Sequence, residues 1–328
     1  MTNNTAEEIR NVINQNSNFY LAGHVSPDGD SIGSCFGLGM ALEKLDKKVQ
    51  VLMEPFHSKY DIIPGRHLLG SAKLENPVLI CLDCADEGRL TGYSKELMGT
   101  LQDTVCIDHH YTNTYFAKFN YVDEKASSTC EVVYRLLDSF VEFDIDIASA
   151  LYAGILSDTG GFRYNATSQN TLSVAGALTA MGIPFTDIYT ELFSLRTYAE
   201  VKLLARVLEN CQRAANARVV HVCVPREMMT NLEDTTDAEP KHLEGVVESL
   251  LNIRRAEVSI LIYDRCKNDE LKISLRSRKL NIGDIAQKYG GGGHQLAAGA
   301  TVKGDIYEIR DKVLGCVLEA LEEQQRTK

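Results

Sequence analysis

The chain has 328 residues, of which 44% are hydrophobic and 24% are charged. These proportions are ordinary for a globular protein with room for two domains, and they exclude disorder as the overall state. A formal net charge of −11 and a pI near 5.3 disfavour tight binding along long nucleic acid, because an acidic protein repels a polyanion. A local basic patch could still hold a short anionic substrate.

The N-terminal residues and the cysteines indicate the cellular compartment. Residues 1–10 are polar and include Glu7 and Glu8, unlike the basic start and apolar core of a secretory signal. No apolar run approaches membrane-spanning length. The nine cysteines lack framework spacing, and Cys81-x-x-Cys84 has no second pair, so we interpret them as reduced thiols and small buried hydrophobes. We expect a cytoplasmic protein with no membrane partner.

The first half of the chain alternates between strand and helix patterns. Apolar runs predict strands at 19–22, 49–53, 78–82 and 104–107, and helical spacing predicts helices at 31–45, 128–137, 145–156 and 168–181. Ser128 and Glu131 have the spacing of a capping box, and Gly182 with Pro184 forms a stop signal. This alternation favours an α/β fold with a parallel, doubly wound sheet.

The second half of the chain has a different pattern of predicted helices and strands. Residues 187–215 have helical spacing and predict a helical connector between a domain at 1–186 and a smaller α+β domain at 216–328. Within the smaller domain we expect strands at 219–224, 258–263 and 271–275, a helix at 243–251, a glycine run at 290–293 and a terminal helix at 306–324.

Four segments of the first domain place acidic and histidine side chains at the end of an apolar run. They are His24-x3-Asp28-Gly29-Asp30, Asp83, Asp108-His109-His110 and Asp158. Because open α/β sheets bind ligands at the carboxyl ends of their strands, these side chains should meet there. Each alone has a plainer explanation as a turn, a helix end or a core histidine, but so many acids at one edge would repel one another without a counter-charge.

Metal ions are the counter-charge that this residue set predicts. Carboxylates and imidazoles suit Mn²⁺, Mg²⁺, Co²⁺ or Zn²⁺. Two such ions roughly 3.5–4 Å apart would need a bridging carboxylate, and Asp83, the lone acid of the middle segment, is the candidate.

A second set of residues predicts phosphate binding in the smaller domain. Four glycines precede His294 and could form a concave nest of backbone N–H groups around an anion. Arg276, Arg278 and Lys279 lie on or just after a predicted strand; such runs are usually a solvated edge, but beside the glycines they favour substrate binding. Arg254 and Arg255 are weaker candidates. Phe162, Tyr164 and Tyr289 are the aromatic residues near the motifs, and no stacking partner is chosen among them.

Five segments together resemble a known family. Gly23–Asp30, Asp108–His110, Ala126–Thr129 and Ser157–Phe162 are similar, in order and spacing, to the motifs of the DHH phosphoesterase superfamily, and Gly290–Gly299 resembles the signature of its associated C-terminal domain. The resemblance spans nearly the whole chain. Within the superfamily, the two-domain layout is most similar to bacterial oligoribonucleases that degrade very short RNAs and remove the 3′-phosphate of adenosine 3′,5′-bisphosphate.

The resemblance implies roles for individual residues. One ion, Mn²⁺ or else Mg²⁺ or Co²⁺, would be held by His24, Asp28 and Asp83, and a second by Asp30, Asp83, His109 and Asp158. Asp108 would orient a histidine, and His110 would face the scissile phosphate. Substrate would be held in the smaller domain, across a cleft that acts as a ruler, by Arg276, Arg278, Gly291, Gly292, Gly293 and His294.

The hypothesis is in-line phosphoester hydrolysis by a metal-activated hydroxide, with short RNA and adenosine 3′,5′-bisphosphate as substrates. A phosphodiesterase of cyclic or linear dinucleotides is an open alternative, and so is a catalytically dead module that binds nucleotides or RNA. Manganese-dependent pyrophosphatases share the N-terminal motifs but lack the Gly290–Gly299 signature. The oligomeric state stays open, with a homodimer among the arrangements considered.

Overall fold

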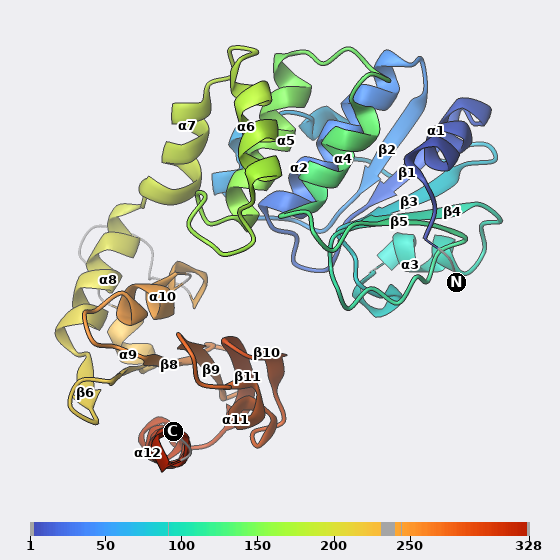
Figure 1. Cartoon of the computed structure of the whole chain (residues 1–328). Helices are drawn as coiled ribbons and strands as arrows, with labels where there is room; N and C mark the ends of the chain where they lie inside the picture. The colour runs from blue at the N-terminus through green and yellow to red at the C-terminus, as the bar shows by residue number, and fades with distance from the viewer. Residues whose placement is uncertain (1–2, 91, 231–239, 244, 327–328) are drawn as a thin grey trace. The chain divides into compact units, whose positions relative to one another are not determined.

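The computed structural model describes residues 3–90, 92–230, 240–243 and 245–326. The chain divides into two compact units, Met1–Leu195 and Arg196–Lys328 (Figure 1). This division falls inside the segment 187–215 that the sequence analysis assigns to a helical connector. No helix in the described ranges is both long enough and apolar enough to cross a membrane.

A parallel five-stranded sheet forms the centre of the first unit. Its strands, in spatial order, are β2 (Lys48–Leu52), β1 (Asn18–Ala22), β3 (Val78–Leu82), β4 (Thr104–Asp108) and β5 (Phe119–Val122). Every neighbouring pair is parallel, which confirms the predicted sheet type. Strand β5 is not predicted from the sequence, because it is a four-residue edge strand in which buried and half-buried positions alternate and Asn120 interrupts the apolar pattern.

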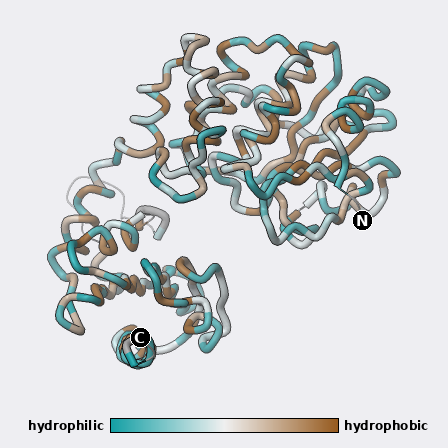
Figure 2. The backbone as a smooth tube through the Cα atoms, viewed as in Figure 1, coloured by the Kyte–Doolittle hydropathy of each residue, from teal (hydrophilic) through white to brown (hydrophobic). Residues whose placement is uncertain are grey.

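Helices cover both faces of this sheet, as a doubly wound fold requires. One face packs against α2 (Gly29–Lys44) and α4 (Thr129–Leu137); α5 (Ile145–Asp158) packs on these two helices, and α6 (Gln169–Thr179) packs on α5. The opposite face packs against α3 (Gly92–Met98) around Tyr20, Cys81 and Leu97. Cys81 and Cys84 are buried free thiols in this second layer, in agreement with their interpretation as small core residues. In Figure 2 the brown, hydrophobic segments follow the central strands.

Two further helices of the first unit lie at its ends in sequence. Helix α1 (Ala6–Gln15) buries Ile9, Val12 and Ile13 against the larger core, and Thr5 with Glu8 forms its capping box. The sequence analysis did not predict it. Helix α7 (Phe185–Tyr189) follows the predicted stop at Gly182.

The second unit is built on a mixed six-stranded sheet. Its spatial order is β10 (Gly292–His294), β11 (Ala297–Lys303), β9 (Glu270–Ser277), β8 (Val258–Asp264), β7 (Val219–Val224) and β6 (Gln212–Ala214). Among the described strands of this sheet, only the β7–β8 pair is parallel. Helices α8 (Tyr198–Glu209), α9 (Arg226–Met229) and α10 (Val246–Leu251) share one core, and α11 (Gly283–Gln287) and α12 (Ile306–Arg326) share the other. The predicted α+β class is confirmed.

Strand β9 shows how this sheet separates a core from a polar surface. Its residues alternate, with Leu271, Ile273 and Leu275 buried in the core shared with α11 and α12. Because successive side chains of a strand point to opposite faces, Lys272, Ser274 and Arg276 share the other face. The alternation therefore presents two cations and a hydroxyl in a row.

Candidate functional site

The carboxyl edge of the first sheet gathers the six predicted metal ligands. His24 follows β1, Asp83 follows β3 and His109 follows β4, while Asp28 and Asp30 begin α2 and Asp158 ends α5. Among the described residues, these side chains and His110 form three groups with ligand atoms within 4.8 Å of one another: Asp83–His109–His110, His24–Asp28–Asp83 and Asp30–His109–Asp158. Residues far apart in sequence thus converge where the predicted topology places them.

The first group is built on His24. Its Nε2 atom lies 3.7 Å from Asp28 Oδ1 and 3.4 Å from Asp83 Oδ2. Its other ring nitrogen, Nδ1, is 2.7 Å from the Val25 carbonyl oxygen, which fixes the ring so that Nε2 faces the acids. Asp28 is also the N-cap of α2, where its Oδ1 accepts from the N–H groups of Asp30 and Ser31, each at 3.1 Å.

The second group surrounds His109. Its Nε2 atom lies 3.2 Å from Asp158 Oδ2 and 4.0 Å from Asp30 Oδ2. Although carboxylates approach from several directions, this buried nitrogen makes no hydrogen bond with any described residue. Since a buried polar atom without a partner is costly, the arrangement fits a cation bound between His109 and the acids.

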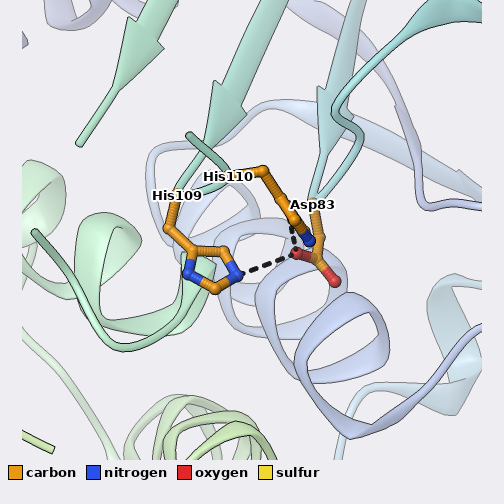
Figure 3. A group of neighbouring side chains, drawn as sticks. All are labelled: Asp83, His109 and His110. Carbon is orange, nitrogen blue, oxygen red and sulfur yellow. Dashed lines mark ion pairs between the residues drawn. The ribbon is translucent and has the colours of Figure 1, made fainter. Parts of the chain in front are cut away.

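Asp83 lies between the two groups. Its Oδ2 faces His24, while its Oδ1 lies 3.6 Å from His109 Nε2 and 3.7 Å from His110 Nδ1 (Figure 3). The Thr129 hydroxyl donates to the same Oδ1 at 3.1 Å and holds the carboxylate in this orientation. Asp83 has a φ of 59°, in the left-handed region that aspartate tolerates better than most residues. One oxygen toward each group is the geometry that a bridging ligand needs.

Asp30 is positioned by the start of α4. Its two oxygens accept from the backbone N–H groups of Thr129, at 2.6 Å, and Cys130, at 2.9 Å. Free N–H groups at a helix N-terminus favour a carboxylate. Gly154 of α5 makes room for this contact, because a Cβ there would lie 2.9 Å from Asp30 Oδ1 and 2.1 Å from Cys130 Sγ.

The capping of α4 differs from the prediction in one detail. Ser128 accepts from the N–H of Glu131, as expected of an N-cap. The Glu131 carboxylate, however, does not return to the Ser128 backbone but accepts from the N–H and hydroxyl of Ser127, at 2.9 and 2.7 Å, and from the Thr171 hydroxyl. This fully buried carboxylate therefore anchors the turn that leads to Thr129.

Asp108 orients a histidine, and that histidine is His110. Oδ1 of Asp108 lies 2.8 Å from His110 Nδ1, and Oδ2 of Asp108 accepts a hydrogen bond from Asn113 Nδ2 at 2.6 Å. The carboxylate thus keeps a proton on Nδ1 and leaves Nε2 of His110 for other partners. Sequence reasoning missed Asn113, because nothing near the motif indicates that the chain turns back at that residue.

The acids raise the proton affinity of the two central imidazoles. Burial lowers the pKa of His24, but Asp28 and Asp83 outweigh it and raise that pKa to about 10. Burial also lowers the pKa of His109, while Asp158, Asp30 and Asp83 raise it to about 10. Protonated imidazoles are therefore the counter-charge of the acids when no cation is bound.

Crowding also raises the pKa values of two of the carboxyl groups. Burial, followed by the charges of Asp83 and Asp158, raises the pKa of Asp30 well above its usual range. Burial also raises the pKa of Asp158, and the charge of Asp83 acts in the same direction. A divalent cation would relieve both repulsion and protonation.

The second unit has a pocket of its own, with a volume of about 260 Å³. Its lining comes from β9, β10 and β11: Lys272, Ser274, Arg276, Gly292, Gly293, Ala297, Ala298 and Gly299. Three of the predicted substrate-binding residues, Arg276, Gly292 and Gly293, are among them. Lys272 and Ser274 were not predicted, although their place on the polar face of β9 could have been found from its alternating pattern.

The remaining predicted substrate residues lie outside this lining, and several have other partners. Arg278 donates to the carbonyl oxygens of Ala256 and Leu251, both at 2.9 Å. The N–H groups of Gly290 and Gly291 bond to Gln287 and Ala286 at the end of α11. The expected nest of four free N–H groups is therefore not formed, because two of them cap a helix. His294 is exposed and pairs with Ala297 in the β10–β11 ladder.

The remaining basic and aromatic candidates for substrate binding differ in how exposed they are. Arg254, Arg255 and Lys279 are exposed. Tyr289 packs on the α11–α12 core with its hydroxyl 3.7 Å from Cys316 Sγ. Phe162 packs on the core of the first unit beside Tyr152, and Tyr164 is 51% exposed. Of the three aromatic candidates, Tyr164 thus has the largest surface available to a ligand.

This fold and this residue set define a class. Residues 18–155 match the family model described as the DHH family, N-terminal domain, and residues 217–323 match the DHHA1 domain. The chain belongs to the DHH family and is a metal-dependent phosphoesterase of that family.

The chain is also similar to individual curated proteins. The chain is 32% identical to the bifunctional oligoribonuclease and PAP phosphatase NrnA of Thermus thermophilus, over 92% of this chain and 90% of that protein. It is 26% identical to the protein of the same name from Bacillus subtilis, over 90% of this chain and 92% of that one.

Solved structures support the fold. An exopolyphosphatase-related protein from Bacteroides fragilis superposes with a TM-score of 0.85 at 24% identity, over 98% of this chain and 96% of that one. RecJ from Thermus thermophilus, in complex with Mn²⁺, superposes with a TM-score of 0.55 at 13% identity, over 96% of this chain and 54% of that one. At these identities the likeness concerns the fold alone.

Proposed function

We propose that the protein is a two-metal phosphoesterase that hydrolyses very short oligoribonucleotides and removes the 3′-phosphate of adenosine 3′,5′-bisphosphate. The observation that carries the proposal is the position of Asp83, whose oxygens face two separate groups of histidine and acidic residues. The names of the curated relatives support the substrate class. We also propose a cytoplasmic location.

Two divalent ions fit the residues of this centre, and we propose Mn²⁺. One would be held by His24, Asp28 and Asp83, and the other by Asp30, Asp83, His109 and Asp158. When bound, such ions polarise phosphoryl oxygens and lower the pKa of water toward about 7, which provides a nucleophile at neutral pH. The unpartnered Nε2 of His109 is the observation that supports this fit.

His110 is the proposed catalytic group of the chain itself. Because Asp108 accepts a hydrogen bond from Nδ1–H, the opposite nitrogen of the ring can donate to a phosphate oxygen as negative charge develops there. The pKa of His110 is raised: burial lowers it, but the hydrogen bond to Asp108 and the charges of Asp108 and Asp83 together outweigh burial. The protonated, donating form is thereby favoured.

The pocket of the second unit is the proposed site for another part of the nucleotide. Lys272 and Arg276 supply positive charge and Ser274 supplies a hydroxyl in a row on one strand. We also propose substrate contacts outside the pocket lining, from Arg278, Gly291 and His294. A small basic pocket on an acidic protein favours substrates of a few nucleotides over long RNA.

The test compares three substrates with purified protein: a diribonucleotide, adenosine 3′,5′-bisphosphate and a cyclic dinucleotide. We expect Mn²⁺-dependent hydrolysis of the first two, complete loss in excess chelator and recovery when Mn²⁺ is returned. Hydrolysis of the cyclic dinucleotide alone would reassign the substrate. Full activity in excess chelator would refute the two-metal centre, and a folded, Mn²⁺-bound protein with no activity would indicate a binding module.

A further inference from the structure

One arginine of the first unit has a buried side-chain nitrogen with no partner among the described residues. Arg89 is half-buried, and its Nε atom is buried without a hydrogen-bond acceptor. Within the described residues, every other half-buried arginine bonds to a carboxylate or a carbonyl oxygen: Arg10, Arg135, Arg206, Arg218, Arg276 and Arg310. A chain with 45 acidic and 34 basic residues offers many acids, so an unpaired guanidinium at half burial is conspicuous.

The backbone around Arg89 is held firmly beside the metal centre. Arg89 ends a short 3₁₀ turn, Glu87–Arg89, that follows Asp83 on the loop after β3. Its N–H donates to the Asp86 carbonyl at 3.2 Å, and its carbonyl accepts from the N–H of Val25 at 2.9 Å. Val25 directly follows His24, so the backbone of Arg89 lies next to a proposed metal ligand while its side chain alone remains unsatisfied.

An unsatisfied buried donor normally destabilises the fold, and more so when the group is charged. In native proteins an unsatisfied donor of this kind often marks a place where a bound ligand supplies the missing acceptor. Arginine presents its donors in a planar fork that matches phosphate oxygens, and it does not lose its proton at physiological pH. The acceptor that fits this place is therefore a phosphate oxygen of the substrate.

Resting on the proposed function, we propose that Arg89 is a substrate-binding residue that contacts a phosphate oxygen of the nucleotide at the metal centre. It neutralises phosphate charge from the β3 side, next to His24. Because the guanidinium keeps its proton, Arg89 changes the strength of catalysis and not its pH profile.

The experiment measures kcat/KM for a diribonucleotide with saturating Mn²⁺ in wild type, Arg89→Met and a matched control, Lys95→Met. Lys95 is an exposed cation of the neighbouring helix α3, so its loss reproduces the change of net charge. We expect kcat/KM to fall about 10²-fold in Arg89→Met, as for other lost transition-state donors, and to stay near wild type in Lys95→Met. Guanidinium ion added to Arg89→Met should restore part of the activity.

Mn²⁺ binding, followed by calorimetry, separates substrate contact from structural support. We expect unchanged Mn²⁺ affinity in Arg89→Met, and Arg89→Gln provides the same comparison if the methionine variant fails to fold. Activity within twofold of wild type, or a parallel loss of Mn²⁺ affinity, would overturn the inference. A wild-type protein with no Mn²⁺-dependent hydrolysis would instead refute the proposed function.

Discussion

The metal centre of the first unit and the pocket of the second differ in how their polar groups are held. In the centre, short side chains come from four segments, and neighbouring groups fix several of them, as the N–H groups of Thr129 and Cys130 fix the buried Asp30. In the pocket, the long side chains of Lys272 and Arg276 extend from one strand. Rigid short ligands suit chemistry, which needs fixed distances, whereas long cations suit recognition of a phosphate.

The two sites also differ in what neutralises their charge. The centre collects acids whose repulsion is relieved only by protonation or by a cation. In the pocket, Arg276 is paired with Glu248 at 2.7 Å, whereas burial and the charges of Arg265 and Arg276 lower the pKa of Lys272. The centre therefore needs a cation, whereas in the pocket Lys272 is the group that an anion would neutralise, because Arg276 already has Glu248.

Replacing Asp83 tests the centre most severely. Asp83→Asn keeps the size and the tolerance for a positive φ but removes the charge that both groups share. We expect kcat/KM to fall by at least about 10³-fold, and calorimetry should count fewer than two Mn²⁺ per chain. Asp146→Asn, at an exposed position of α5, is the control. Wild-type turnover in Asp83→Asn would exclude a bridging role.

Replacing the pocket cations should affect recognition and spare the chemistry. In Lys272→Met with Arg276→Met, we expect KM for a diribonucleotide to rise about tenfold or more, because charge-assisted hydrogen bonds contribute roughly 1.5–3 kcal/mol each. The rate with bis(4-nitrophenyl) phosphate should stay unchanged, since that substrate needs only the centre. Lys267→Met, at an exposed turn, is the control. Equal losses with both substrates would mean that the pocket does not bind nucleotide.

A methyl group at Gly154 tests how tightly the centre is packed. Gly154→Ala would bring a Cβ within 2.1 Å of Cys130 Sγ and 2.9 Å of Asp30 Oδ1. We expect a loss of about 1–3 kcal/mol in the free energy of unfolding, together with weaker Mn²⁺ binding. Gly176→Ala is the matched control, because its Cβ meets nothing within 4 Å and alanine favours a helix. Similar stability of the two variants would show that the centre tolerates repacking.

The pH dependence of the chelated protein tests which groups neutralise the acids when no cation is bound. The pKa values of His24 and His109 are raised to about 10. A raised pKa gives stability that is present below the unfolded value, about 6.5, and is lost as pH rises through the folded value. With excess chelator, the unfolding temperature of the first unit should therefore fall by at least about 4 °C between pH 6.5 and 10.

Saturating Mn²⁺ should reduce that fall, because an imidazole nitrogen that binds metal carries no proton. The measurement is a set of thermal melts followed by circular dichroism with chelator and with Mn²⁺. A chelated protein whose unfolding temperature is independent of pH would contradict the assigned counter-charge.

The sequence by itself determined the parallel sheet and the meeting of its motifs. Short apolar runs such as Val78–Leu82, alternating with helix patterns, favour central strands, and the carboxyl ends of parallel strands share one edge. Asp83 and His109 therefore had to lie near each other once β3 and β4 were recognised. The observed parallel pairing of β3 with β4 agrees with this expectation.

The tertiary structure alone decided which side chain contacts which. The Thr129 hydroxyl on Asp83, the helix capping that uses the N–H of Gly291, and the missing partner of Arg89 depend on segments that are close in space but unmarked in sequence. Local patterns report burial and periodicity, because those act on neighbours in the chain. A hydrogen bond between distant segments depends on distances of a few tenths of an ångström, which only the packed fold sets.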